Sequence, residues 1–101
     1  MTNPIEIITQ TTQALAANPA DTAALKLRAI TLCQMQQFDE AITDLNTLID
    51  ELRSDDAEVY QLRGTIRMNR GDKHGALDDM RHALDLNPDL LHLLSGEFRT
   101  K

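Results

Sequence analysis

The sequence predicts an all-α protein built from antiparallel helix hairpins, and three observations support this fold class. Four Gly and three Pro in 101 residues are too few for an all-β fold or for a disordered chain. The chain also resembles itself when it is shifted by roughly 34–35 residues. Within one repeat, apolar residues recur at the spacing of a buried helical stripe: Ile42, Leu45, Leu48, Ile49 and Leu52.

Charge and composition exclude several functional classes. The chain carries 16 acidic against 10 basic residues, a net charge of −6, so we expect no nucleic-acid partner, which would need a basic surface. No window reaches the roughly 18 apolar residues of a membrane span, and the first residues lack the pattern of a secretion signal. The single Cys33 excludes an internal disulfide and fits a reducing compartment. We therefore expect one cytoplasmic domain over residues 1–101, with no membrane partner.

The N-terminal segment, residues 4–19, is expected to be a half-repeat whose single helix, residues 4–17, caps the array. Asn18-Pro19 precedes Asn87-Pro88 by two repeat periods, one of each length. Because Asn-Pro is a typical helix end, the two pairs mark the ends of equivalent helices.

Residues 22–55 form the first full copy, with helices expected at about 20–35 and 38–53. Of the two repeat periods, roughly 34 and 35 residues, this copy has the longer one. The additional residue is expected in the acidic turn at 53–56, where Pro is absent.

Residues 57–88 form the second full copy, with helices expected at about 56–70 and 73–86. Gly64 lets the two helices approach closely, because it has no side chain. Gly71 suits the left-handed conformation that often ends a helix. This stretch therefore predicts one complete helix hairpin.

The spacing of the small and aromatic residues in the second copy resembles that of the tetratricopeptide repeat, a helix pair of about 34 residues. The marker residues are Tyr60, Gly64, Gly71, Ala76, Ala83 and Pro88. The resemblance covers residues 4–88 and implies a right-handed superhelix of hairpins, with no cofactor and no catalytic activity. Leu25 and Arg67 depart from it, because they occupy places where the family usually has aromatic residues.

One departure suggests a repeated ion pair. Arg28 and Arg63 stand at equivalent positions, and each is followed at the same separation by an aspartate, Asp44 or Asp79. In an antiparallel hairpin these positions could face each other, so we expect a bidentate bridge in each copy. The alternative is a set of solvated charges, which would contribute little to stability.

The resemblance also implies where a partner would bind. In this family the first helix of each hairpin lines a concave face that holds peptides or partner proteins. The residues expected on that face are Ala23, Lys26, Ile30, Cys33, Gln34, Glu58, Gln61, Thr65, Met68 and Asn69.

Other candidate chemistry is weak. His74, Asp78 and His82 have a spacing that can hold a metal, but the alignment places them on a solvent-facing side of their helix, so we expect no metal site. The basic stripe that starts at Arg63 and continues through Arg67 and Arg70 is expected to pair within the chain. No phosphate loop or nucleophile motif is present, so we expect no enzyme.

The last segment, residues 89–101, is rich in leucine and leaves two possibilities open. A short helix at 88–95 could cap the chain's own core. Alternatively, the segment could form a dimer interface, because two full copies fall short of the three that such arrays usually need. The residues that would associate are Leu90, Leu91, Leu94 and Phe98.

Overall fold

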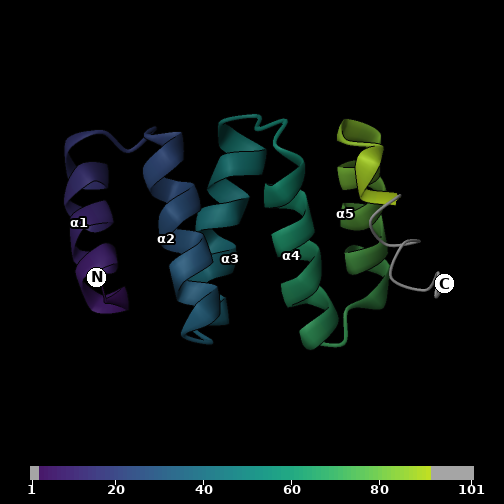
Figure 1. The fold of residues 1–101 in the computed structure, drawn as a ribbon, viewed down its shortest axis with the longest axis horizontal. Coiled ribbons are helices and arrows are strands. Elements are labelled where there is room, and N and C mark those ends of the chain that lie inside the picture. Colours follow the sequence, from purple (N-terminus) through teal and green to yellow (C-terminus); the bar gives the residue numbers. More distant parts are fainter. Residues whose placement is uncertain (1–2, 92–101) are drawn as a thin grey trace, which may run out of the picture. The chain divides into compact units, whose positions relative to one another are not determined.

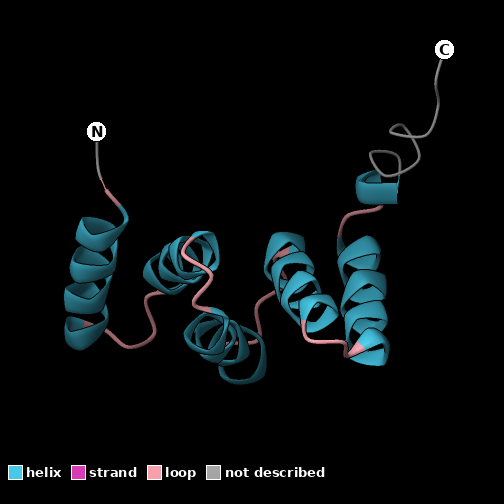
Figure 2. Cartoon of the chain, turned by 90° about the horizontal axis from the view of Figure 1, so that it is seen from below, coloured by secondary structure: helices cyan, strands magenta, loops and turns pink. Residues whose placement is uncertain are grey.

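Asparagine or aspartate begins four of the helices in the computed structural model, which describes residues 3–91 (Figure 1). Asn3 and Glu6 form a reciprocal capping box at the first helix, while Asp21, Asp56 and Asp72 each accept a bond from a backbone N–H of the following helix. The described residues contain helices joined by short loops and no strand (Figure 2), which confirms the all-α prediction. The elements are α1 (Pro4–Ala17), α2 (Thr22–Gln34), α3 (Phe38–Asn46), the π-helical turn η1 (Thr47–Glu51), α4 (Ala57–Asn69) and α5 (Lys73–Leu86).

The chain divides into two units between Ser54 and Asp55. In the first unit, α2 packs against both α1 and α3, and α1 and α3 do not contact each other. The predicted stripe of α3 and η1 faces this packing: Leu45, Leu48 and Ile49 are buried, and the two flanking positions are half-buried. The apolar period therefore located the core of this unit correctly.

The second unit is the α4–α5 hairpin, and Gly64 sets how closely its helices approach. A Cβ atom at Gly64 would lie 3.2 Å from the Asp79 Cβ and 3.3 Å from the Ala76 carbonyl oxygen. Ala76 and Ala83 are fully buried on the facing side of α5. Small residues on both helices therefore allow the contact that the sequence predicted.

The element bounds support the repeat register. The starts of α1 and α3 are separated by the shorter of the two repeat periods, whereas the starts of α2 and α4, and those of α3 and α5, are separated by the longer one. Since the ends of α1 and η1 are still separated by the shorter period, the additional residue lies between Glu51 and Ala57. This longer turn is closed by a backbone hydrogen bond that spans more residues than a helical one, from the Ser54 N–H to the Leu48 carbonyl. Arg53 lies within the turn and has a positive φ of 55°.

Both hairpin turns use a left-handed residue at the same register position. Gly71 has φ 84°, and its equivalent in the first copy, Gln36, has φ 61°. Each turn is closed by a 2.8 Å bond, from the Asp72 N–H to the Arg67 carbonyl and from the Gln37 N–H to the Leu32 carbonyl. This is the helix ending predicted for Gly71, but a side chain at Gln36 is sterically strained there.

We expect Gln36→Gly to raise the free energy of unfolding by about 0.5–1 kcal/mol, because it removes the left-handed strain at a cost in chain entropy. The matched change, Gly71→Ala, should lower it by about 1 kcal/mol, since no atom lies within 4 Å of a Cβ there and only the backbone is strained. Urea denaturation followed by circular dichroism measures both. If both variants changed the free energy of unfolding in the same direction and by the same amount, the two turns would not share this left-handed geometry.

Candidate functional site

The predicted ion pairs are present in both copies and are bidentate. Arg28 donates from Nε and Nη2 to the two Asp44 oxygens at 2.8 and 2.7 Å. Arg63 does the same to Asp79 at 3.0 and 2.9 Å. The carboxylates are almost completely buried, with 5% and 3% of each side chain exposed. The bridges therefore tie the two helices of each hairpin, and the alternative of solvated charges is wrong.

The two bridges differ in their third partner. Arg28 also donates from Nη1 to the hydroxyl of Thr12 on α1, at 3.2 Å. In the second copy, Asp79 accepts a further bond from Arg67 at 3.1 Å, and Arg67 also approaches the Gly75 carbonyl at 3.4 Å. The prediction that Arg67 pairs within the chain is thus confirmed. At a position where the family usually has an aromatic residue, this chain has a second guanidinium that bonds to the same carboxylate.

Electrostatics at the first bridge favour the charged pair. The hydrogen bonds to Asp44 raise the pKa of the Arg28 guanidinium above its ordinary value, against the opposing effect of partial burial. The charges of Asp44 and, more weakly, Glu40 act in the same direction. The Arg28 guanidinium therefore stays charged over the whole physiological range.

On α2 and α4, the residues expected to face a partner lie at matching register positions and are exposed or half-buried. On α2, Lys26, Ile30 and Cys33 are half-buried, whereas Ala23 and Gln34 are exposed. On α4, Gln61 is half-buried, and Glu58, Thr65, Met68 and Asn69 are exposed. None of these ten residues is fully buried. We call the five positions on each helix the open face of α2 or of α4.

The open face of α4 is hollowed at two places. Glu58, Gln61 and Thr65 line a shallow hollow of about 280 Å³ together with Leu62. A wider hollow of about 560 Å³ lies at the start of α4, and both Glu58 and Gln61 border it as well. Its remaining lining residues are Asp55, Asp56, Ala57, Leu86, Asn87 and Leu90. Three of the five α4 residues predicted to bind a partner therefore border a hollow, whereas Met68 and Asn69 do not.

The other singled-out residues take structural or surface positions. Burial raises the pKa of the Cys33 thiol, which makes it a poor nucleophile at neutral pH. His74, Asp78 and His82 are exposed, as predicted. The His82 ring stacks on Tyr60, with ring centroids 4.4 Å apart and planes 2° from parallel, a contact that sequence reasoning missed.

The expected C-terminal helix is only partly described. Asp89 starts a helical turn, and its N–H donates to the Asn87 side chain at 3.1 Å. Leu90 is half-buried, and Leu91 is 58% exposed. Leu94 and Phe98 lie outside the described residues.

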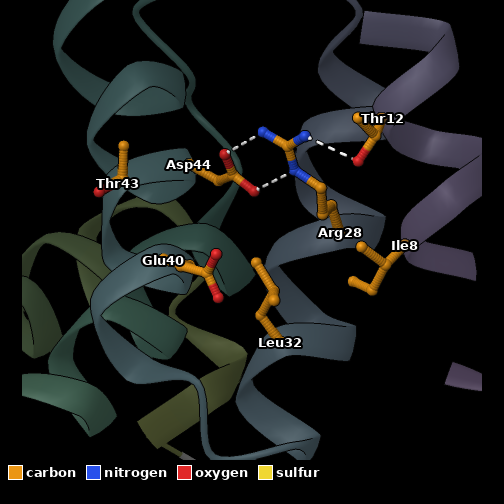
Figure 3. A pocket seen from close by; sticks show the side chains of 7 residues that line it. All are labelled: Ile8, Thr12, Arg28, Leu32, Glu40, Thr43 and Asp44. Atoms are coloured by element: carbon orange, nitrogen blue, oxygen red, sulfur yellow. Dashed lines mark hydrogen bonds and ion pairs between the residues drawn. The ribbon is translucent and has the colours of Figure 1, made fainter. Parts of the chain in front are cut away.

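A further hollow in the first unit was not anticipated from the sequence (Figure 3). It has a volume of about 280 Å³ and lies between α1 and α3, with α2 forming its floor. Each helix contributes two residues spaced i, i+4, and α3 adds Thr43 as a third. This spacing is the signal that could have identified the hollow. The lining residues are Ile8, Thr12, Arg28, Leu32, Glu40, Thr43 and Asp44. We call this hollow the α1–α3 groove.

Helix hairpins repeated at a nearly constant period, with an open face on the first helix of each pair, define a helical-repeat interaction protein. The family model described as Tetratricopeptide repeat matches residues 10–66, more than half of the chain. The chain belongs to the tetratricopeptide repeat family, as the spacing of its marker residues predicted.

Two relatives are similar over most of this chain. "Tetratricopeptide repeat protein 34" of Mus musculus is 30% identical over 91 residues, which cover 85% of this chain and 16% of that protein. "Ethylene-overproduction protein 1" of Arabidopsis thaliana is 34% identical over 74 residues, covering 73% of this chain and 8% of that protein. The chain thus spans only a small part of either relative. None of the helices within residues 3–91 has the length and apolarity needed to cross a membrane.

Proposed function

We propose that this chain is a non-catalytic interaction module that binds a peptide or partner protein on the open faces of α2 and α4. The observation that carries the proposal is the repetition of five open positions on α2, from Ala23 to Gln34, at five positions on α4, from Glu58 to Asn69. Membership of a family of protein-interaction modules supports it. A cytoplasmic location, and a partner other than nucleic acid or membrane, complete the proposal, since the acidic balance disfavours phosphate ligands.

Mixed chemistry on the open faces favours a peptide over a small ligand. Ile30 and Met68 supply apolar surface, while Lys26, Gln61 and Thr65 supply polar groups along the same helices. An extended segment can contact several of these positions, and its side chains can enter the hollows of α4. The proposed partner is therefore a peptide segment that carries both apolar and polar side chains.

Site-specific photo-cross-linking tests this proposal. A benzophenone side chain is placed at Thr65 on the open face and, as a matched control, at Arg81, which is exposed on α5 away from α4. In native lysate we expect a discrete partner to be captured from Thr65 and not from Arg81, and Gln61→Ala with Lys26→Ala to reduce the capture. Equal capture from both positions, or none from Thr65, would refute binding on this face.

A second candidate function is self-association through the C-terminal end. Leu86 is 39% exposed and Leu91 is 58% exposed, so large apolar side chains face solvent near this end. If this end forms a dimer, Leu91→Asp should convert a dimeric native mass to a monomeric one. Leu77→Asp, a change at a similarly exposed apolar position on α5, should leave the mass unchanged.

A further inference from the structure

The α1–α3 groove lies on the opposite side of α2 from its open face. Ile30 of the open face is two positions from both Arg28 and Leu32 of the groove, which places it about 160° around the helix from each. A ligand in the groove would therefore not compete with a partner on the open face. The groove needs an explanation of its own.

The groove carries an unbalanced negative charge beside apolar walls. Arg28 neutralises Asp44, but Glu40 stands one helical turn earlier on the same face of α3 and points toward the hollow (Figure 3). Within the described residues the Glu40 carboxylate has no hydrogen bond or ion pair of its own. The side chains of Ile8 and Leu32 supply apolar surface next to it. This combination suits a long side chain with a cationic end.

The second copy shows which cation fits this place. The equivalent of Leu32 is Arg67, whose guanidinium bonds to Asp79 at 3.1 Å beside the Arg63 bridge. The equivalent of Glu40 is Gly75, and a Cβ there would meet the Asp72 carboxylate first and then the Arg67 Cδ at 3.0 Å. In the second copy, therefore, the chain's own arginine fills the space next to the bridged aspartate, and glycine makes room for it.

The first copy has the reverse arrangement. Leu32 supplies no cation, Glu40 adds a carboxylate where Gly75 stands in the second copy, and the space is open. In the first copy, the charges of Arg28, Glu40 and Asp44 sum to −1. In the second copy, the charges of Arg63, Arg67 and Asp79 sum to +1. One added guanidinium would neutralise the first copy.

From this comparison we infer that the α1–α3 groove binds an arginine side chain of a partner protein. The guanidinium lies against the Glu40 and Asp44 carboxylates, as Arg67 lies against Asp79, and the aliphatic stem packs on Ile8 and Leu32. The planar fork of arginine can bond both carboxylates at once, which the point charge of lysine cannot do as well. The site is therefore selective for arginine over lysine.

A set of three matched peptides tests the inference on the full chain. The probes are acetyl-Gly-Gly-X-Gly-Gly-amide with X as arginine, lysine or citrulline, the last being an uncharged analogue of arginine. In ¹⁵N-resolved NMR titrations we expect the arginine peptide to shift the amides of Thr12, Leu32, Glu40 and Thr43, with a Kd on the order of 1–10 mM. The lysine peptide should bind at least about fivefold more weakly, and the citrulline peptide should produce no such shifts.

Two variants locate the site. Glu40→Gln, at an exposed position, should weaken arginine binding by about five- to tenfold, whereas Glu51→Gln, the same change at an exposed position outside the groove, should not. Leu32→Arg should supply the cation in cis, as Arg67 does, and abolish binding. Because Leu32 is buried, circular dichroism must show that this variant folds, and the Glu40→Gln result stands without it.

The inference is overturned if the citrulline or lysine peptide shifts the same amides as strongly as the arginine peptide. Shifts spread over the acidic residues of both units, or unchanged affinity in Glu40→Gln, would overturn it too. Photo-cross-linking from Thr65 should be insensitive to Glu40→Gln. The groove and the proposed binding on the open faces can therefore fail separately.

Discussion

Asp79→Ala is expected to lower the free energy of unfolding by about 3–5 kcal/mol, because it removes a buried carboxylate that accepts hydrogen bonds from two guanidinium groups. Only 3% of the Asp79 side chain and 10% of the Arg63 side chain are exposed, and Arg67 bonds to the same carboxylate. In the variant these two cations would lie close together and lose the carboxylate that they share. Urea denaturation of the full chain measures the loss.

Two variants separate this charge effect from other causes. Asp78→Ala, at the adjacent exposed position, should change stability by less than about 0.5 kcal/mol. The apolar pair Arg63→Met with Asp79→Leu should recover most of the loss, because it removes the buried charge together with its partner. If the double variant were as unstable as Asp79→Ala, the loss would come from packing and not from removing the carboxylate that Arg63 and Arg67 share.

Gly64→Leu is expected to destabilise the α4–α5 hairpin by about 3 kcal/mol, since the added side chain has no space between the helices. A Cβ alone would already approach the Asp79 Cβ and the Ala76 carbonyl within 3.2 and 3.3 Å. Gly64→Ala should therefore stay within about 1 kcal/mol of the wild type, because better helix propensity offsets the tight contact. Thermal unfolding compares the two variants, and a similar Tm for both would contradict the close approach of the helices.

The repeat register and the bridges could be predicted because both depend on spacing alone. The repeat period fixes which positions are equivalent, and the separation of Arg28 from Asp44 along the chain is enough to bring them face to face across a hairpin turn. The same reasoning applied to Arg63 and Asp79, which have the same separation. Helix ends were less predictable: α2 begins at Thr22 and not at residue 20, because Asp21 caps it after the turn at Pro19.

The α1–α3 groove and the role of Gly75 could not be predicted because they depend on the absence of atoms. The sequence marks Gly75 as a weak helix former, but in the structure its missing Cβ leaves space for Arg67 and for the Asp72 cap. Likewise, the alignment pairs Leu32 with Arg67 without showing that one leaves a space the other fills. Side-chain length and direction decide such features, and periodicity specifies only the face of the helix.

The stack of Tyr60 on His82 gives this protein a built-in optical probe. Tyr60 is the single tyrosine in a chain without tryptophan. Its ring stacks on His82 between α4 and α5, and the Arg63 guanidinium lies 6.0 Å from the centre of the Tyr60 ring. Its fluorescence therefore reports on the α4–α5 hairpin alone, whereas far-ultraviolet circular dichroism averages over both units. Recorded together during denaturation, the two signals distinguish concerted unfolding, in which they coincide, from separate melting of the two units.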